Sequence, residues 1–228
     1  MVQQFLDVVI PQGCALCGTR VTGIGVCEAC RRELPWLLAA CPRCARPVPT
    51  GLTSKEACGA CQRRPPPFDR AVAPLHYGFP IDSLIKSLKF RNQLWLAPVL
   101  AELVAPAVTE RHLRVDGIVP VPLHRWRHAR RGFNQADELA RALGRQLDLP
   151  RLALLRRHRR TRPQTGLSAA ARRRNLSRAF AFVGSQPPKR VLLIDDVITT
   201  GETARSAAEV LRSAGVAEIC LVAVARAS

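Results

Sequence analysis

The chain has 228 residues, an apolar fraction of 47% and a formal net charge of +18. This length suits one medium-sized domain with a smaller one beside it, and the apolar fraction supports a real hydrophobic core. Apolar runs are shorter than the roughly 18 residues of a membrane-spanning helix, and the first residues do not resemble a secretory signal, so we expect a cytoplasmic protein without a membrane span.

Cysteines dominate the first part of the chain. Eight of the nine cysteines form four Cys-x2-Cys pairs: Cys14 and Cys17, Cys27 and Cys30, Cys41 and Cys44, and Cys58 and Cys61. Such a pair places two thiolates on one tight turn, ready for two corners of a tetrahedral Zn²⁺ site. Four pairs therefore predict two structural zinc sites. Disulfides are the competing interpretation, but they are rare in a cytoplasmic protein.

The assignment of the four pairs to two ions has two solutions. In the sequential arrangement, which we expect, the first four cysteines bind one ion and the last four bind the other. An interleaved arrangement uses the same ligands. Because few apolar residues lie between the cysteines, this segment needs metal to fold. Three prolines at 65–67 form a stiff spacer, so we predict a double zinc ribbon over 1–64 and a second domain over 65–228.

Beyond the spacer the pattern is that of an α/β domain. Helical spacing of apolar residues predicts helices over 80–90, 92–108 and 134–147, the last with Asn134 as its N-cap. Strands are predicted over 69–79, 116–123, 152–156, 179–183, 189–195 and 218–226. Alternating strands and helices imply a parallel sheet flanked by helices, with ligands bound beyond the carboxyl ends of its strands. Cys220 lies in the last apolar run and is expected to be a core thiol.

The charge excess is concentrated between residues 111 and 190, where about 20 lysines and arginines face about 4 acids. A basic surface of this size attracts polyanions, which include nucleic acid and pyrophosphate. The alternative is a high-GC genome that encodes arginine wherever a solvated cation is tolerated. Charge alone therefore leaves contact with nucleic acid open.

A basic loop follows the predicted strand 116–123. It contains Arg130, Arg131 and Gly132 and ends where the helix at Asn134 begins. A strand, a loop with cations and glycine, and a helix N-terminus together form an anion site that suits pyrophosphate. The alternative interpretation is a basic surface turn.

Residues 191–203, with the sequence VLLIDDVITTGET, are the most informative segment. A buried strand ends in Asp195 and Asp196, and a short loop of threonines and glycine leads into a helix. Amides at the helix start and the threonine hydroxyls attract a phosphate, while the two carboxylates accept hydrogen bonds from vicinal ribose hydroxyls. Gly201 lets the backbone approach the ligand closely.

This segment resembles the phosphoribosyl pyrophosphate (PRPP) signature of the type I phosphoribosyltransferases. The resemblance implies that Asp195 and Asp196 form the catalytic pair that binds the ribose hydroxyls. The 5′-phosphate loop would then consist of Thr199, Thr200, Gly201, Glu202 and Thr203. The resemblance places pyrophosphate at the loop 130–132 and a closing hood over 159–182. The hood residues expected to reach the pyrophosphate are Arg162, Gln164, Arg172 and Arg173, with a solvated basic helix as the alternative.

Four features in chain order narrow the resemblance further. They are the cysteine pairs, residues 65–90, residues 119–140, and the stretch from 162 to 203. Over nearly its whole length the chain resembles the ComF family. The resemblance implies a double zinc ribbon joined to a type I phosphoribosyltransferase domain. It also implies a role in natural transformation or the use of external DNA, alongside a helicase-like competence ATPase.

Two functions from different classes follow. The first is an enzyme that binds PRPP with Mg²⁺ and transfers the phosphoribosyl group. Its acceptor is unidentified, because Thr199 stands where purine-salvage relatives often have an aspartate near the incoming base. The second is a PRPP-sensing accessory protein that binds single-stranded DNA through its ribbons and basic face. The low count of one Tyr and three Trp speaks against the second function, since base stacking needs aromatic rings.

Overall fold

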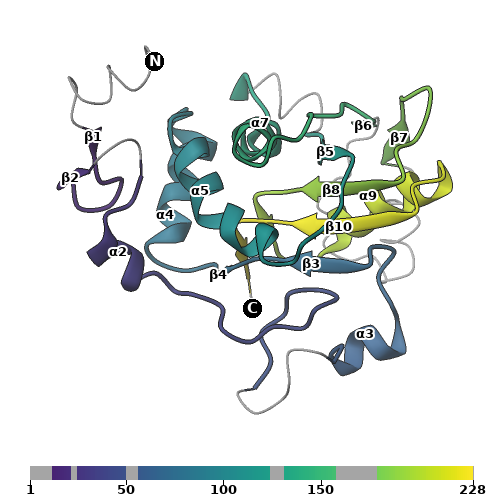
Figure 1. Ribbon diagram of the computed structural model, residues 1–228, viewed down its shortest axis with the longest axis horizontal. Helices are drawn as coiled ribbons and strands as arrows, with labels where there is room; N and C mark the ends of the chain where they lie inside the picture. The colour runs from purple at the N-terminus through teal and green to yellow at the C-terminus, as the bar shows by residue number, and fades with distance from the viewer. Residues whose placement is uncertain (1–11, 22–24, 50–55, 124–130, 158–178, 228) are drawn as a thin grey trace, which may run out of the picture.

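The computed structural model describes residues 12–21, 25–49, 56–123, 131–157 and 179–227, and all structural statements concern these residues. Figure 1 shows a central sheet with helices on both faces and the cysteine-rich segments at its periphery.

Four parallel strands form the centre of the fold, in the order β3-β10-β8-β5. Their bounds are Arg70–Val72 for β3, Glu218–Val222 for β10, Arg190–Ile194 for β8 and Gly117–Pro120 for β5. In the register of this sheet, Leu192 of β8 lies between Cys220 of β10 and Ile118 of β5. The predicted parallel sheet is therefore confirmed. Cys220 is 2% exposed, as expected of a core thiol.

Three of these strands continue into a second, shorter parallel sheet. Its order is β4-β11-β9, with bounds Leu75–His76, Ala225–Arg226 and Val197–Ile198. Asp195 and Asp196 form the interruption between β8 and β9. The backbone stays bonded there, since Asp195 N donates to Val222 O at 3.0 Å and Val224 N donates to Asp196 O at 3.1 Å. Strand β5 has no counterpart in the described second sheet, so the sheet narrows at the acid pair.

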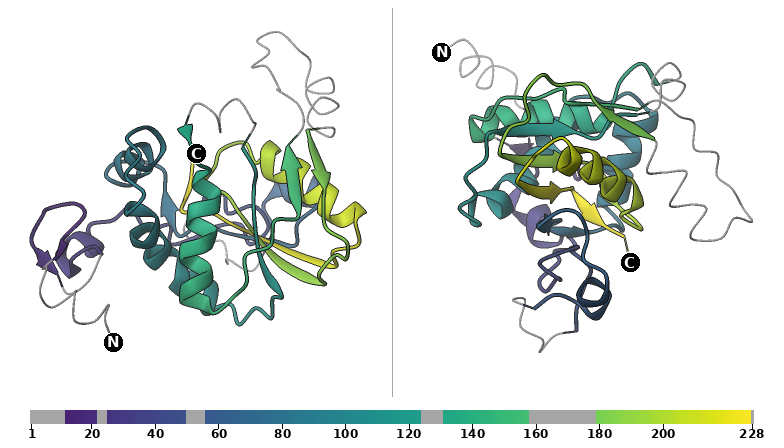
Figure 2. Two further views of the ribbon diagram at one scale, coloured as in Figure 1. Left: turned by 90° about the horizontal axis from the view of Figure 1, so that it is seen from above. Right: turned by 90° about the vertical axis from the view of Figure 1, so that its right-hand side faces the viewer.

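Helices cover both faces of the sheet (Figures 1 and 2). One face carries α4 (Ile81–Phe90), α5 (Leu96–Thr109) and α7 (Gln135–Leu147), and the other carries α9 (Glu202–Ser213). Leu192 and Ile194 of β8 pack into the first apolar layer, while the alternating Val191 and Leu193 pack into the second. Strands buried on both faces explain the continuous apolar run of this segment. The predicted N-cap is confirmed, because Asn134 Oδ1 accepts from Ala136 N at 3.3 Å.

Two predicted strands lie outside the parallel sheet. Strands β6 (Leu155–Arg157) and β7 (Phe180–Phe182) pair antiparallel with each other. Phe180 joins the apolar layer beneath α9, so the pair is held by packing on that helix as well as by its own hydrogen bonds. The alternation of strands with helices could not distinguish this arrangement from further parallel strands.

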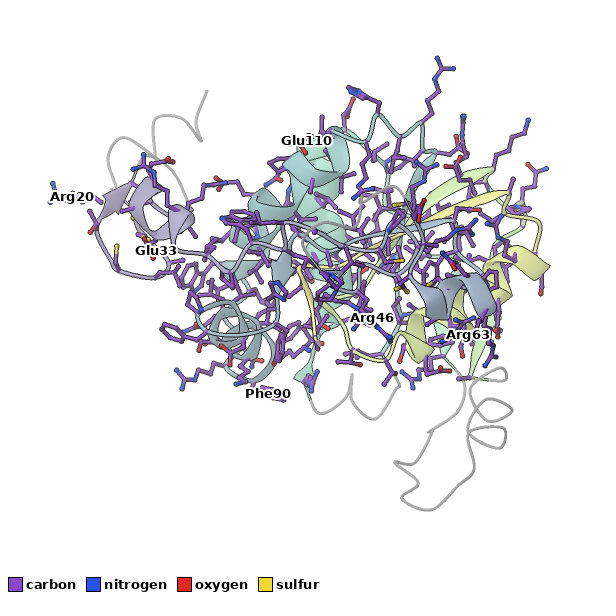
Figure 3. The ribbon with its side chains drawn as sticks, turned by 90° about the horizontal axis from the view of Figure 1, so that it is seen from below. Arg20, Glu33, Arg46, Arg63, Phe90 and Glu110 are labelled. Atoms are coloured by element: carbon purple, nitrogen blue, oxygen red, sulfur yellow. The ribbon has the colours of Figure 1, made fainter. Side chains whose placement is uncertain are left out.

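The cysteine-rich segments lie at different parts of the sheet's periphery (Figures 1 and 3). The first contains β1 (Gln12–Gly13), β2 (Arg20–Val21) and α2 (Glu28–Arg32), and the second contains α3 (Gly59–Arg63). Arg31 of α2 pairs with Glu102 of α5 at 2.5 Å, whereas Ala71 N of β3 donates to Pro42 O at 2.9 Å. Figure 3 labels Arg20 near the first segment and Arg63 near the second, at opposite ends of that view.

The chain between the two cysteine segments runs along the edge of the second sheet. Trp36 forms an antiparallel bridge with Leu75 of β4, and His76 N donates to Pro35 O at 2.8 Å. Val26 packs with the helices of one face, while Ala45 packs with the apolar layer of the other. The predicted division of the chain at residue 64 stays a prediction. Among the described helices, none combines the length and hydropathy needed to cross a bilayer.

Candidate functional site

Asp195 and Asp196 lie at the carboxyl end of β8, where the sheet narrows. Asp195 Oδ1 accepts a hydrogen bond from Asp196 N at 2.9 Å. A small cavity of about 10 Å³ adjoins Asp195 and is lined by apolar side chains that include Ala101, Leu139 and Val224. Asp195 therefore lies against the apolar layer, whereas the carboxylate of Asp196 pairs with Lys89.

Burial, and after it the negative charge of Asp196, raise the pKa of Asp195 to about 7. The hydrogen bond from Asp196 N and the positive charges of Lys89 and Arg157 act in the opposite direction. Poor solvation thus outweighs the favourable partners. A carboxylate in this setting gains from a ligand that brings hydroxyl donors, because such donors replace the missing water.

Within the described part of the chain, Lys89 forms an ion pair with the acid pair. Its Nζ lies 2.7 Å from Asp196 Oδ2, and the side chains of Lys89 and Asp196 are only 20% and 13% exposed. Lys89 belongs to the last turn of α4. The predicted helix 80–90 contained this residue, but nothing in a helical pattern indicates a partner more than a hundred positions away in the chain.

The predicted phosphate loop follows the acid pair after the two residues of β9. Gly201 is the N-cap of α9 with φ +79°, a left-handed conformation that favours glycine, and Glu202 N lies 3.4 Å from Thr200 Oγ1. Thr199 and Thr200 are exposed, and Glu202 and Thr203 form the first turn of the helix. The structure therefore brings the two acids and a helix N-terminus together, which is the arrangement that suits a sugar phosphate.

Arg226 of β11 supports the start of this loop. Its side chain is buried, and Nη1 donates to Ile198 O at 2.9 Å and also to Thr199 O. Burial lowers the pKa of Arg226, while the thiolates of Cys44 and Cys58 oppose that effect. Sequence analysis missed Arg226, because an arginine at the end of an apolar strand gives no signal of burial.

The predicted pyrophosphate loop adjoins the end of α4. The guanidinium of Arg131 lies over the ring of Phe90, 4.8 Å from its centroid, and Arg131 Nη1 donates to Gln135 Oε1 at 3.1 Å. Gly132 has φ +78°. Phe90 is the neighbour of Lys89, so one helix end touches both the acid pair and this loop. Other predicted residues lie outside the described part of the chain: Arg130, Arg162, Gln164, Arg172 and Arg173.

The cysteine sulfurs gather into two groups of four. The first group is Cys14, Cys17, Cys27 and Cys30, and the second is Cys41, Cys44, Cys58 and Cys61, with the sulfurs of each group within 4.8 Å of one another. The structure thus has the sequential arrangement that we expected. Four thiolates at this separation are the ligand set of a closed tetrahedral Zn²⁺ site. Backbone amides support them, since Cys27 N donates to Cys14 Sγ at 3.3 Å and Cys58 N donates to Cys41 Sγ at 3.2 Å.

Ionisation of the thiols is uneven within each group. Burial raises the pKa of Cys14, but hydrogen bonds from backbone amides outweigh it and bring the pKa down to about 6. The side chains of Cys17 and Cys27 raise the pKa of Cys30 to about 12. Four thiols therefore compete for negative charge, and a divalent soft cation removes this competition. The residues fit Zn²⁺ on these grounds.

A large apolar groove lies away from the acid pair. It encloses about 860 Å³ between the first cysteine segment and α4, and its walls include Leu16, Phe79 and Trp95. Cys17 and Cys30 are the predicted site residues among those that line it. The groove is mainly apolar and therefore does not suit a sugar phosphate.

Known proteins resemble both halves of the chain. Residues 5–62 match the double zinc ribbon domain family and residues 129–228 match the phosphoribosyl transferase domain family. The chain is 39% identical to competence protein F of Haemophilus influenzae over 212 residues, which are 89% of this chain and 91% of that protein. It is 35% identical to the DNA utilization protein YhgH of Escherichia coli K12 over 201 residues, covering 86% and 87% of the two chains. Competence protein ComFC of Streptococcus pneumoniae is 31% identical over 134 residues, 58% of this chain and 56% of that protein.

Proposed function

Because the chain belongs to the ComF family of competence and DNA utilization proteins, with a double zinc ribbon before a phosphoribosyltransferase domain, we propose that it binds PRPP with Mg²⁺ in the cytoplasm. We further propose that it transfers the phosphoribosyl group to an acceptor during the use of external DNA. One observation carries the proposal: two adjacent carboxylates at the end of β8 are followed, after the short strand β9 and two threonines, by the glycine-capped N-terminus of α9.

The order of these groups matches the order of groups in a phosphorylated pentose. Asp195 and Asp196 accept hydrogen bonds from the 2′ and 3′ hydroxyls of the ribose. The amides at the start of α9, together with the hydroxyls of Thr199, Thr200 and Thr203, bind the 5′-phosphate. Glu202 takes part through its backbone, because a carboxylate beside a phosphate is repulsive. Gly201 leaves the approach to the backbone open.

The pyrophosphate side of the ligand faces the basic loops. Arg131 and Gly132 bind the pyrophosphate, and we assign the same role to Arg130, Arg162, Gln164, Arg172 and Arg173. Mg²⁺, when bound, neutralises the leaving group. As the bond from C1 to pyrophosphate breaks, its electron pair leaves with the pyrophosphate and a nucleophile bonds to C1. Positioned cations and the exclusion of water are the contributions of the protein.

A second function is favoured by the charge. A net charge of +18 and relatives named for competence and DNA utilization support a non-catalytic protein that senses PRPP and binds single-stranded DNA. In that case the zinc ribbons and the basic segment 111–190 contact the phosphate backbone, and a helicase-like competence ATPase is the partner. Binding to phosphates would weaken steeply with salt.

Calorimetry with PRPP and Mg²⁺ tests the first function. The unaltered protein is expected to release heat that the double variant Asp195→Ala/Asp196→Ala loses, because both hydroxyl acceptors are gone. Asp82→Ala is the matched control, since Asp82 is a carboxylate on α4 whose partners in the described part of the chain are Lys86 and Ser83 of the same helix. No heat from the unaltered protein would overturn the proposal.

A parallel measurement separates the two functions. Pyrophosphate release that needs Mg²⁺ and disappears in the double variant supports the enzyme. Salt-sensitive binding of a labelled single-stranded oligonucleotide that survives in the double variant, without pyrophosphate release from the unaltered protein, supports the accessory protein.

A further inference from the structure

Lys89 occupies a largely buried position, where a charged side chain lowers the stability of the folded protein. Its side chain is only 20% exposed, and its ammonium is held at 2.7 Å from Asp196 Oδ2. Withdrawing both charges from water costs several kcal/mol, and the long side chain loses rotamer freedom. A lysine one turn earlier gives the contrast, because Lys86 pairs with Asp82 while remaining 56% exposed. The ion pair of Lys89 is therefore far more shielded from water than that of the other lysine on α4.

The backbone that carries Lys89 is firmly anchored. Ile81, Ile85 and Leu88 on the same helix are all 0% exposed and belong to the apolar layer that covers the sheet. The last turn of α4 is thus fixed relative to β8 and its acids. Any response of Lys89 to a ligand is confined to the flexible four-carbon side chain.

The end of α4 also touches the predicted pyrophosphate loop. Phe90 follows Lys89, and its ring lies under the guanidinium of Arg131 at 4.8 Å. One helix end therefore reaches the ribose side of the site through Lys89 and the pyrophosphate side through Phe90. The ammonium at the boundary of these two regions stands close to the anionic part of any PRPP bound to Asp196.

We propose that Lys89 is a PRPP-binding residue that neutralises Asp196 in the free protein and pairs with pyrophosphate oxygens in the complex. The inference rests on the proposed function of the same site and adds a cation from a helix outside the known signature. When ribose hydroxyls donate to Asp196, they take over part of its solvation. The Lys89 ammonium can then move from Asp196 to the pyrophosphate, because the pyrophosphate has the larger negative charge.

The test compares three ligands on one variant. Lys89→Met removes the charge while keeping a side chain of similar length, and calorimetry in Mg²⁺ measures the dissociation constants of PRPP, pyrophosphate and ribose 5-phosphate. We expect about 10- to 100-fold weaker binding of PRPP and pyrophosphate, the range of one hydrogen bond between charged groups. Binding of ribose 5-phosphate, which lacks the pyrophosphate, is expected to change less than threefold.

Two further variants control for folding and charge. Lys86→Met removes the exposed lysine of the same helix and is expected to leave all three affinities unchanged. Lys89→Arg keeps a cation and is expected to recover part of the lost PRPP affinity. Thermal melting of each variant shows whether α4 and the sheet remain folded.

The outcomes distinguish this inference from the proposed function. Unaltered PRPP binding by Lys89→Met overturns the inference alone. An equal loss for all three ligands also overturns it, because that result assigns Lys89 to the structure of the site and not to pyrophosphate. If the unaltered protein binds no PRPP, the proposed function and this inference both fail.

Discussion

The substitution Asp195→Asn tests the electrostatics of the acid pair in the free protein. Asparagine keeps the shape of the side chain and an oxygen that can accept the 2.9 Å hydrogen bond from Asp196 N. It removes one of two neighbouring negative charges from a poorly solvated position. We therefore expect the variant to be more stable than the unaltered protein at pH 8, although it binds PRPP more weakly.

The raised pKa of Asp195 determines whether the substitution stabilises or destabilises the protein. Asp195 has a pKa of about 7 in the folded protein against 3.8 in the absence of these surroundings. Between these pH values the folded state keeps a proton that the unfolded chain has lost, so stability falls as the pH rises through this window. Above about pH 7 Asp195 is ionised in both states, and the folded protein carries the full free-energy cost of its poorly solvated carboxylate. The whole shift corresponds to at most about 4 kcal/mol, and because Asp195 is only partly buried by exposed area, solvent screening reduces the expected effect to about 1–2 kcal/mol.

Thermal melting over pH 4–8.5 measures the effect. For a chain of this length, 1–2 kcal/mol corresponds to roughly 3–6 °C, so Asp195→Asn is expected to melt that much higher at pH 8 and almost equally at pH 4. Asp116→Asn is the control of opposite sign. A hydrogen bond from the backbone amide of Arg190 lowers the pKa of Asp116. Removing the charge of Asp116 therefore destabilises the protein at neutral pH, and the difference in melting temperature from the unaltered protein shrinks as the pH falls. A lower melting temperature of Asp195→Asn at pH 8, or a difference independent of pH, would refute the reasoning.

Two other predictions concern the second cysteine group and its surroundings. Cys41→Ser removes one sulfur of the second cysteine group, a thiol that is 1% exposed. Metal analysis is expected to find one zinc per chain, against two expected for the unaltered protein, and the melting temperature should be lower; two retained ions contradict the predicted ligand set. Arg226→Met removes the donor of Thr199 O and one of the two donors of Ile198 O, which keeps the hydrogen bond from Ala227 N at 2.9 Å. We expect a loss of about 1–3 kcal/mol in the free energy of unfolding, measured by chemical denaturation. A denaturation midpoint unchanged from that of the unaltered protein would contradict this supporting role of Arg226.

Several features could be predicted because they depend on residues close together in the chain. The Cys-x2-Cys spacing indicated metal knuckles, and the apolar run before Asp195 and Asp196 indicated a strand buried on both faces. Asn134 could be recognised as an N-cap because its partner, Ala136 N, is two residues away. Each of these signals is a short-range preference of the backbone or of a metal ion.

Other features were not predictable from local patterns. Strands β6 and β7 pair with each other, although their sequences look like the strands of the parallel sheet. The sequence was compatible with two ways of sharing eight cysteines, and the folded chain shows one of them. Lys89 and Arg226 looked like ordinary residues of a helix and a strand, because their partners lie far away along the chain.

The amino-acid sequence by itself determined the metal-ligand types and the order of acids, loop and helix, since each arises within a few consecutive residues. The alternation of strands and helices beyond residue 65 indicated the parallel α/β character. Only the tertiary structure decided which cation faces Asp196, which arginine supports the loop, and where the two cysteine groups lie around the sheet. These depend on the order β3-β10-β8-β5. That order is selected by the packing of whole helices on both faces, so no single segment of the chain contains the information.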